Sequence, residues 1–255
     1  MSAPIRDQVV LVTGSSRGVG LAIAQAFRKE GAKIVINYHN TASRQTAEAA
    51  ADDLDAVALQ ADVTDAAAMK QLFASAEHIY RQPISVVVNN ALADFQFNPD
   101  NRAKIDSITW EEFDNQLQGS VKGALNTTQA ALPGFERLGY GRIVNISSNL
   151  LHDPKVPYHD YVASKGALLG LTRTAAHDLG PKAITVNLVS GGLLQTTDAS
   201  KHTSDEVFEM IKAVTPLRKV TTPKDIAGAV LFFASPWASA ITGQNLIVDG
   251  GACMN

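Results

Sequence analysis

The sequence contains a single cysteine, Cys253, so no disulfide bond can form within the chain. A chain with so few thiols fits a reducing compartment better than a disulfide-stabilised secreted one. The N-terminal segment lacks the apolar core of a secretory signal, and no apolar run reaches the roughly 18 residues that a membrane span needs. We therefore expect a soluble, cytoplasmic protein that does not bind membranes.

Strong charge of one sign is also missing. The formal net charge is -3 and the Lys and Arg residues are scattered, which argues against binding to nucleic acid. The six histidines show no ligand-like spacing with one another or with Cys253, so no metal site is expected. The remaining composition, 45% hydrophobic and 18% charged over 255 residues, is that of a globular protein with a sizeable core.

Short apolar runs alternate with amphipathic segments along the chain. The runs are too short for helices and end in turn residues, so they predict buried strands. The expected strands are Val9–Val12, Lys33–Asn37, Ala56–Gln60, Val86–Val88, Arg142–Ile146, Ile184–Val189 and Asn245–Val248. The expected helices are a first one that stops near Gly31, then Thr41–Asp53, Asp65–Tyr80, Thr109–Arg137, Tyr161–Leu179 and Lys224–Ala234.

This alternation indicates a parallel sheet with helices on both faces. Right-handed crossovers then give a doubly wound, Rossmann-type α/β fold of about seven strands. The sequence shows no internal repeat, low-complexity tract or linker, so one domain over residues 1–255 is the simplest interpretation.

A glycine-rich turn, T-G-S-S-R-G-V-G at 13–20, follows the first predicted strand. Glycine adopts positive φ and lets the backbone approach a ligand closely, and the N-terminus of the next helix favours a pyrophosphate. The glycine spacing differs from the commonest fingerprint, so its place between strand and helix carries the inference. The turn predicts a dinucleotide site made by Gly14, Ser16, Arg17, Gly18, Val19 and Gly20.

The end of the second strand indicates which dinucleotide binds. An acidic residue there usually binds the ribose 2′-hydroxyl of NAD, but this sequence reads Asn37, Tyr38, His39 and Asn40. No carboxylate in that stretch would repel a 2′-phosphate, and Arg17 can pair with one. We predict NADP(H) rather than NAD, with Asn37, Tyr38 and His39 beside the cofactor.

Tyr161 and Lys165 are four residues apart on a predicted helix and therefore share a face. An ammonium near a phenol stabilises the phenolate, so Lys165 is expected to lower the pKa of Tyr161 from about 10. Ser147 and Ser148 end the preceding strand, at the edge of the sheet where ligands collect. A serine hydroxyl there can hold a substrate carbonyl oxygen.

Together these segments resemble the short-chain dehydrogenase/reductase family over essentially the whole chain. The matching segments are T-G-S-S-R-G-V-G (13–20), A-D-V-T (61–64), V-N-N-A (88–91), R-I-V-N-I-S-S (142–148), Y-V-A-S-K (161–165), V-N-L-V (186–189) and I-T-G-Q-N-L-I-V-D-G-G (241–251). Within the family, Arg17, V-I-N-Y at 35–38 and P-L-R-K at 216–219 are most similar to the 3-oxoacyl-[acyl-carrier-protein] reductases of fatty acid biosynthesis.

The resemblance implies that Tyr161 is the general acid. It implies that Lys165 lowers the pKa of Tyr161 and binds the nicotinamide ribose, and that the Ser148 hydroxyl orients the substrate carbonyl. It also implies cofactor contacts at the adenine (Asp62, Val63), at the ribose (Asn90, Ala91) and at the carboxamide (Leu194, Thr196). The expected substrate is a small-molecule or acyl-carrier-protein-bound carbonyl compound, and the expected assembly is a homotetramer.

Three positions depart from the family pattern: Leu92 and Gly191 stand where the family has Gly and Pro, and Ser120 stands where it has an Asn that completes a proton relay. Ser120 can still kink the helix and bind water, so Ser120 is expected to be a fourth catalytic residue, in a weakened or rearranged relay. Substrate contacts are expected from residues 92–101, 150–158 and 193–202, with Phe95, Phe97, Leu150, Leu151 and Leu193 as a possible apolar pocket.

Because a fold does not fix a substrate, two alternatives remain open: a reductase of another ketone, sugar or alcohol, and a nucleotide-binding regulatory protein without turnover.

Overall fold

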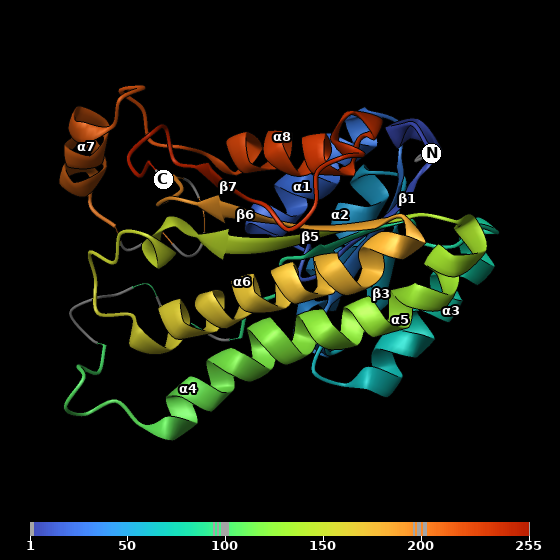
Figure 1. Cartoon of the computed structure of the whole chain (residues 1–255), viewed down its shortest axis with the longest axis horizontal. Helices are drawn as coiled ribbons and strands as arrows, with labels where there is room; N and C mark the ends of the chain where they lie inside the picture. Colours follow the sequence, from blue (N-terminus) through green and yellow to red (C-terminus); the bar gives the residue numbers. More distant parts are fainter. Residues whose placement is uncertain are drawn as a thin grey trace.

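The computed structural model describes residues 3–93, 95, 97, 102–195, 197, 200 and 203–254. Over these residues the chain forms one seven-stranded parallel sheet in the order β3-β2-β1-β4-β5-β6-β7 (Figure 1). The strands are β1 (Val9–Val12), β2 (Lys33–Tyr38), β3 (Val57–Gln60), β4 (Val86–Asn89), β5 (Gly141–Ser148), β6 (Ile184–Gly191) and β7 (Asn245–Val248). The order reverses direction between β1 and β4, as a doubly wound sheet requires.

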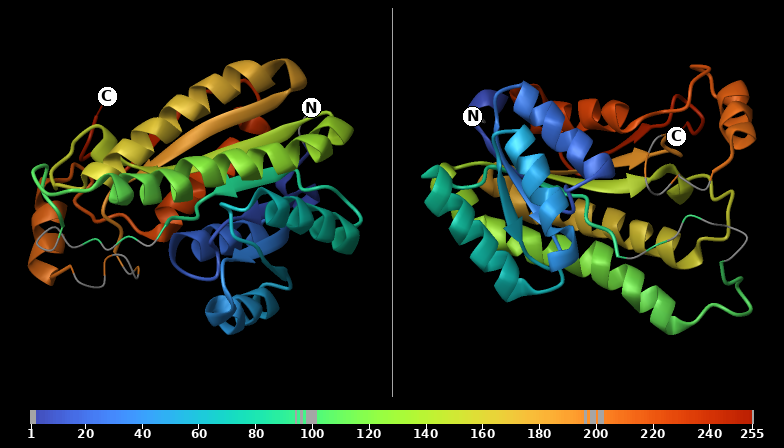
Figure 2. Two further views of the ribbon diagram at one scale, coloured as in Figure 1. Left: turned by 90° about the horizontal axis from the view of Figure 1, so that it is seen from below. Right: turned by 180° about the vertical axis from the view of Figure 1, so that it is seen from behind.

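Alternate residues of each strand point to opposite faces of the sheet and build two separate cores. In β1, Val10 and Val12 pack into one core, while Val9 and Leu11 pack into the other. The first core is covered by α1 (Gly18–Lys29), α2 (Arg44–Asp53) and α8 (Pro223–Ala234). The second is covered by α3 (Ala66–Tyr80), α5 (Gly123–Leu138) and α6 (His159–Leu179), which lie on the far side of the sheet from α1 in Figure 2. The predicted Rossmann-type architecture is confirmed.

The predicted long helix Thr109–Arg137 is interrupted. It consists of α4 (Trp110–Leu117), a π-helical turn (Gln118–Lys122) and α5. A β-carbon at Gly119 would lie 2.6 Å from the β-carbon of Ala93, so only glycine allows the helix to approach this segment. π-Turns inside helices often mark functional positions, and this one contains Ser120.

The sequence analysis missed one helix, α7 (Asp205–Val214), in a segment where it predicted neither helix nor strand. Apolar side chains at Val207, Met210, Ile211 and Val214 recur at helical spacing, a signal that was present in the sequence. Among the described residues, no helix is both long enough and apolar enough to cross a bilayer.

Candidate active site

The glycine-rich turn lies at the carboxyl end of β1 and opens onto a cleft of about 1610 Å³. Gly14 and Gly18 have φ values of +61° and +60°, which L side chains rarely adopt. A β-carbon at Gly18 would meet no described atom within 4 Å, so the turn leaves open space in front of α1. The N-cap residue Arg17 makes no side-chain capping bond in the described structure. The first N–H groups of α1 therefore suit an anionic pyrophosphate.

Asn37 lines this cleft, but its side chain makes its hydrogen bonds to the protein's own backbone. Its Oδ1 accepts a hydrogen bond from the Gly14 N–H at 3.1 Å, and its Nδ2 donates to the Ala61 carbonyl at 3.0 Å. Its backbone N–H donates to the Ser15 hydroxyl at 3.1 Å. The amide thereby connects the ends of β1, β2 and β3, which requires one acceptor and one donor on the same side chain.

Gly20 does not line the cleft, in contrast to the other predicted glycines of the turn. Its own position explains this, because a β-carbon there would lie 2.7 Å from both the Asn90 Nδ2 and the Gly14 carbonyl oxygen. Asn90 Nδ2 donates to the carbonyls of Thr13 and Gly14 at 2.9 and 3.1 Å. Gly20 thus lets α1 pack tightly against the turn and so fixes the shape of the site.

We expect Gly20→Ala to destabilise the fold by about 2 kcal/mol, the usual cost of overpacking, and to weaken binding of the dinucleotide that the turn predicts. Chemical denaturation and titration with nicotinamide dinucleotides measure both effects. Gly228→Ala in α8 is the matched control, because a β-carbon there meets nothing within 4 Å, and alanine in an open helical position stabilises. Equal effects of the two substitutions would contradict the packing role of Gly20.

His39 and Asp62 meet where β2 and β3 end. The His39 Nε2 lies 3.3 Å from the Asp62 Oδ2, and both side chains are partly exposed. Burial alone would raise the pKa of Asp62, but hydrogen bonds from Thr64 and the charge of His39 outweigh it and hold that pKa below its usual value. The Asp62 carboxylate, which lines this end of the cleft, is therefore turned to a histidine and a threonine.

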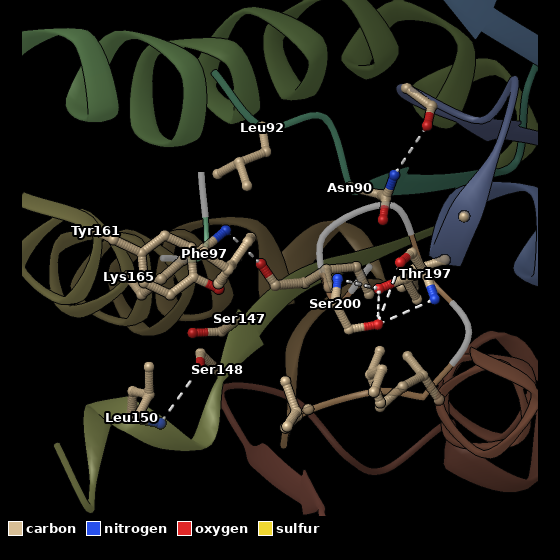
Figure 3. A pocket seen from close by; sticks show the side chains of 18 of the residues that line it. Asn90, Leu92, Phe97, Ser147, Ser148, Leu150, Tyr161, Lys165, Thr197 and Ser200 are labelled. Carbon is tan, nitrogen blue, oxygen red and sulfur yellow. Dashed lines mark hydrogen bonds between the residues drawn. The ribbon is translucent and has the colours of Figure 1, made fainter. Parts of the chain in front are cut away.

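Three of the four predicted catalytic side chains, Ser148, Tyr161 and Lys165, meet at the carboxyl end of β5 (Figure 3). The Ser148 hydroxyl accepts a hydrogen bond from the Leu150 N–H at 3.2 Å, and both it and the Tyr161 phenol line the cleft. Lys165 Nζ donates to the Ile146 carbonyl at 3.0 Å and lies 5.5 Å from the centre of the Tyr161 ring. Position i and i+4 of α6 therefore place the phenol and the ammonium on one face, as the sequence predicted.

The protonation of this pair differs from the prediction. Burial raises the pKa of Tyr161 to about 12, and the neighbouring Ser148 hydroxyl offsets this only in part. Burial lowers the pKa of Lys165 to about 8. The expected lowering of the Tyr161 pKa by Lys165 is not seen, because desolvation of the phenolate dominates this pKa and Lys165 is itself desolvated. At neutral pH the phenol keeps its proton and can act as a donor.

The departures from the family pattern have distinct environments. Ser120 is buried in the π-turn, where the Ser164 hydroxyl donates to it at 3.4 Å and also donates to the Tyr161 carbonyl at 2.8 Å. Ser120 does not line the cleft, so the structure places it behind Tyr161. Leu92 does line the cleft, and a β-carbon at Gly191 would meet the Ile226 Cδ1 at 3.0 Å.

Most of the predicted site residues line one continuous cleft. They are Gly14, Ser16, Arg17, Gly18, Val19, Asn37, Tyr38, His39, Asp62, Val63, Asn90, Ala91, Ser148, Tyr161, Lys165 and Leu194. Thr196 lies outside the described residues. Ser147, which the sequence analysis named beside Ser148 without giving it a role, also lines the cleft, and its buried hydroxyl has no hydrogen-bond partner among the described residues. The sequence analysis missed the α7 side chains Val207, Met210, Ile211 and Val214.

Comparisons with known proteins agree with this geometry. A family model described as "Enoyl-(Acyl carrier protein) reductase" matches residues 14–253. The chain is 34% identical to the 3-oxoacyl-[acyl-carrier-protein] reductase FabG of Staphylococcus aureus, over 96% of this chain and 97% of that protein. It is 31% identical to NADPH-dependent aldehyde reductase 2, chloroplastic, of Arabidopsis thaliana, over 98% and 95%.

A third relative is versicolorin reductase stcU of Emericella nidulans, with 35% identity over 96% of this chain and 95% of that protein. The crystal structure of a putative gluconate dehydrogenase from Agrobacterium tumefaciens superposes with a TM-score of 0.86 and 27% identity, covering 98% of each chain. The fold and the cleft define a nicotinamide-dependent oxidoreductase. The chain belongs to the short-chain dehydrogenase/reductase family.

Proposed function

We propose that this protein is an NADP(H)-dependent carbonyl reductase in which Ser148, Tyr161 and Lys165 are the catalytic residues. The observation that carries the proposal is that the Ser148, Tyr161 and Lys165 side chains meet at the carboxyl end of β5, in a cleft that runs on to the glycine-rich turn. The open space at Gly18 and the uncapped start of α1 fit a pyrophosphate.

Each side chain has a definable task. The two hydroxyls of Ser148 and Tyr161 hold the substrate carbonyl oxygen, and the Tyr161 phenol, protonated at neutral pH, donates the proton that the alkoxide needs. Lys165 is anchored by the Ile146 carbonyl and supplies positive charge beside the phenol. A bound nicotinamide supplies or accepts the hydride.

Two features of the cleft, at the end where β2 and α1 meet it and where the adenosine of the cofactor would bind, support a preference for NADP(H). The described segment 37–40 at the end of β2 carries no carboxylate, and Asp62 is already engaged by His39 and Thr64. Arg17 lines the cleft at the start of α1. A guanidinium there can form charge-assisted hydrogen bonds to a 2′-phosphate.

We expect Arg17→Ala to raise the KM for NADPH about tenfold, which is the loss of one charge-assisted hydrogen bond, and to change the KM for NADH much less. Steady-state kinetics with the two cofactors measures this split. Arg137→Ala, far from the cleft and paired with Glu77, is the control and should leave both values unchanged. An equal loss for NADPH and NADH would contradict recognition of the 2′-phosphate by Arg17.

For the substrate, the similarity to FabG supports a 3-oxoacyl thioester as the first compound to test. The apolar side chains of α7 that line the cleft, among them Met210 and Val214, offer a surface for an acyl chain. We expect NADPH oxidation with acetoacetyl-coenzyme A. Turnover would support the thioester assignment, while NADPH binding without thioester turnover would move the search to other ketones and aldehydes.

The family resemblance implies that the chain is a single domain and that it assembles as a homotetramer, and we include both in the proposal. Light scattering coupled to size-exclusion chromatography tests it directly. A monomer in solution would contradict this part of the proposal.

A further inference from the structure

Aromatic side chains surround the catalytic tyrosine. The ring centres of Phe95 and Phe97 lie 4.8 and 5.4 Å from that of Tyr161, and 5.2 and 5.9 Å from that of Tyr158. Most of these pairs meet edge to face, the geometry that aromatic quadrupoles prefer. Phe97, Tyr158 and Tyr161 line the cleft, whereas Phe95 lies behind them and packs against all three.

An ion pair holds Phe95 in this place. The Arg102 guanidinium lies 4.5 Å from the centre of the Phe95 ring and donates a hydrogen bond to the Asp160 carboxylate. Asp160 is 2% exposed and directly precedes Tyr161. The Arg102 Nε and the Asp160 Oδ1 are both buried without a partner among the described residues.

Such an ion pair contributes little to the stability of a fold. The desolvation penalty of two buried charges exceeds their electrostatic attraction unless every polar atom has a hydrogen-bond partner. Its geometric effect is specific, however. Asp160 is fixed by α6, Arg102 is fixed by Asp160, and the ring of Phe95 is fixed between Arg102 and Tyr161. The pair therefore sets the position of the aromatic rings relative to the reacting hydroxyl.

The rest of the wall near Tyr161 is apolar but not aromatic. Leu92 and Leu150 line the cleft in the same region, so the space next to the Tyr161 hydroxyl has an aromatic side and an aliphatic side (Figure 3). A flat ring attached to the carbonyl carbon can stack or meet edge-on against Phe97 and Tyr158. A saturated ring of the same size gains contact area there but no quadrupole interaction.

We propose that Phe97 and Tyr158 recognise a planar aromatic ring next to the reacting carbonyl, and that Arg102 and Asp160 are positioning residues that hold Phe95 behind this wall. The substrate class is thus an aryl ketone or the corresponding secondary alcohol. The inference rests on the proposed carbonyl reductase activity and narrows its substrate.

The test compares acetophenone with cyclohexyl methyl ketone, which have the same carbon skeleton and differ in aromaticity. Phe97→Leu keeps an apolar side chain and removes the ring, so we expect the KM for acetophenone to rise about fivefold, a usual loss for one aromatic pair. The KM for the cyclohexyl ketone should stay within about twofold. Phe113→Leu, on α4 and stacked on Trp110 outside the cleft lining, is the matched control.

The positioning role is tested with Arg102→Gln and Arg102→Lys. We expect the glutamine variant to raise the KM for acetophenone about threefold with little change in kcat, since a lost cation–π contact displaces Phe95. The lysine variant, which keeps the charge, should recover part of this loss. A fall of kcat for both ketones in equal measure would assign Arg102 a structural role and overturn its positioning role.

A second measurement separates this inference from the proposed function. Calorimetric binding of the two ketones to the enzyme loaded with NADP⁺ needs no turnover. A preference for acetophenone that Phe97→Leu abolishes supports the aromatic wall even if neither ketone is reduced, in which case only the reductase activity fails. Equal binding of the two ketones, or a ratio of their KM values that Phe97→Leu leaves unchanged, overturns the aromatic wall.

Discussion

Tyr161→Phe is expected to lower kcat/KM for carbonyl reduction about a thousandfold while leaving the fold and NADPH binding intact. The substitution removes only the phenol hydroxyl, the proposed proton donor in the cleft, and a positioned general acid contributes on the order of 10²–10⁴ in rate. The buried ring, which packs against Phe95 and Phe97, is retained. Steady-state kinetics over ketone concentrations below and above KM measures the loss.

Tyr140→Phe is the matched control, because Tyr140 is another buried tyrosine but lies before β5, outside the cleft lining. Its kcat/KM should match that of the unsubstituted protein. Retention of more than about a tenth of the activity in Tyr161→Phe would show that another group supplies the proton.

Lys165→Met is expected to abolish turnover and at the same time stabilise the protein without cofactor. Burial lowers the pKa of Lys165 from 10.5 to about 8, so the folded state binds this proton less tightly than the unfolded state. Below pH 8 the full penalty opposes folding, about 3 kcal/mol at 1.4 kcal/mol per unit. As the pH rises from about 8 to 10.5 the unfolded chain loses the proton as well, and the penalty disappears.

Thermal unfolding at pH 7 and pH 10 checks this sign. The melting temperature of Lys165→Met should exceed that of the unsubstituted protein at pH 7, and the difference should shrink at pH 10. Lys182→Met is the control, since Lys182 is an exposed lysine paired with Glu136, and it should show no gain. A lower melting temperature for Lys165→Met at pH 7 would mean that the bond to the Ile146 carbonyl outweighs the desolvation of the charge.

The strands were predictable because each is a short, continuous apolar run, a pattern that a sheet buried on both faces imposes. All seven predicted strands are present, with ends shifted by a few residues. The break between α4 and α5 was not predictable from periodicity, since a π-turn adds a residue without changing the apolar character of the helix. It depends on the close approach of Gly119 to Ala93, a contact between distant parts of the sequence.

Some properties of the site were likewise predictable from the sequence, and others were not. The chain positions of Tyr161, Lys165 and Ser148 predicted their meeting, because α6 and the end of β5 fix them locally. The pKa of Tyr161 was predicted with the wrong sign, since burial is a property of the folded protein and cannot be read from the four-residue spacing. The ion pair between Arg102 and Asp160 joins side chains 58 positions apart, and no local pattern announces it.

The amide of Asn37 constrains how the cofactor preference of this enzyme can evolve. A carboxylate at this position, the common route to NAD, could accept from Gly14 but could not donate to the Ala61 carbonyl, and would face that oxygen as a buried charge. In a lineage that acquires Asn37→Asp, the hydrogen bonds that connect the ends of β1, β2 and β3 would be weakened before a new hydrogen bond to the ribose improved NAD binding. A change of coenzyme in descendants of this protein is therefore expected to arise at Tyr38, His39 or Arg17, with residue 37 retained as asparagine.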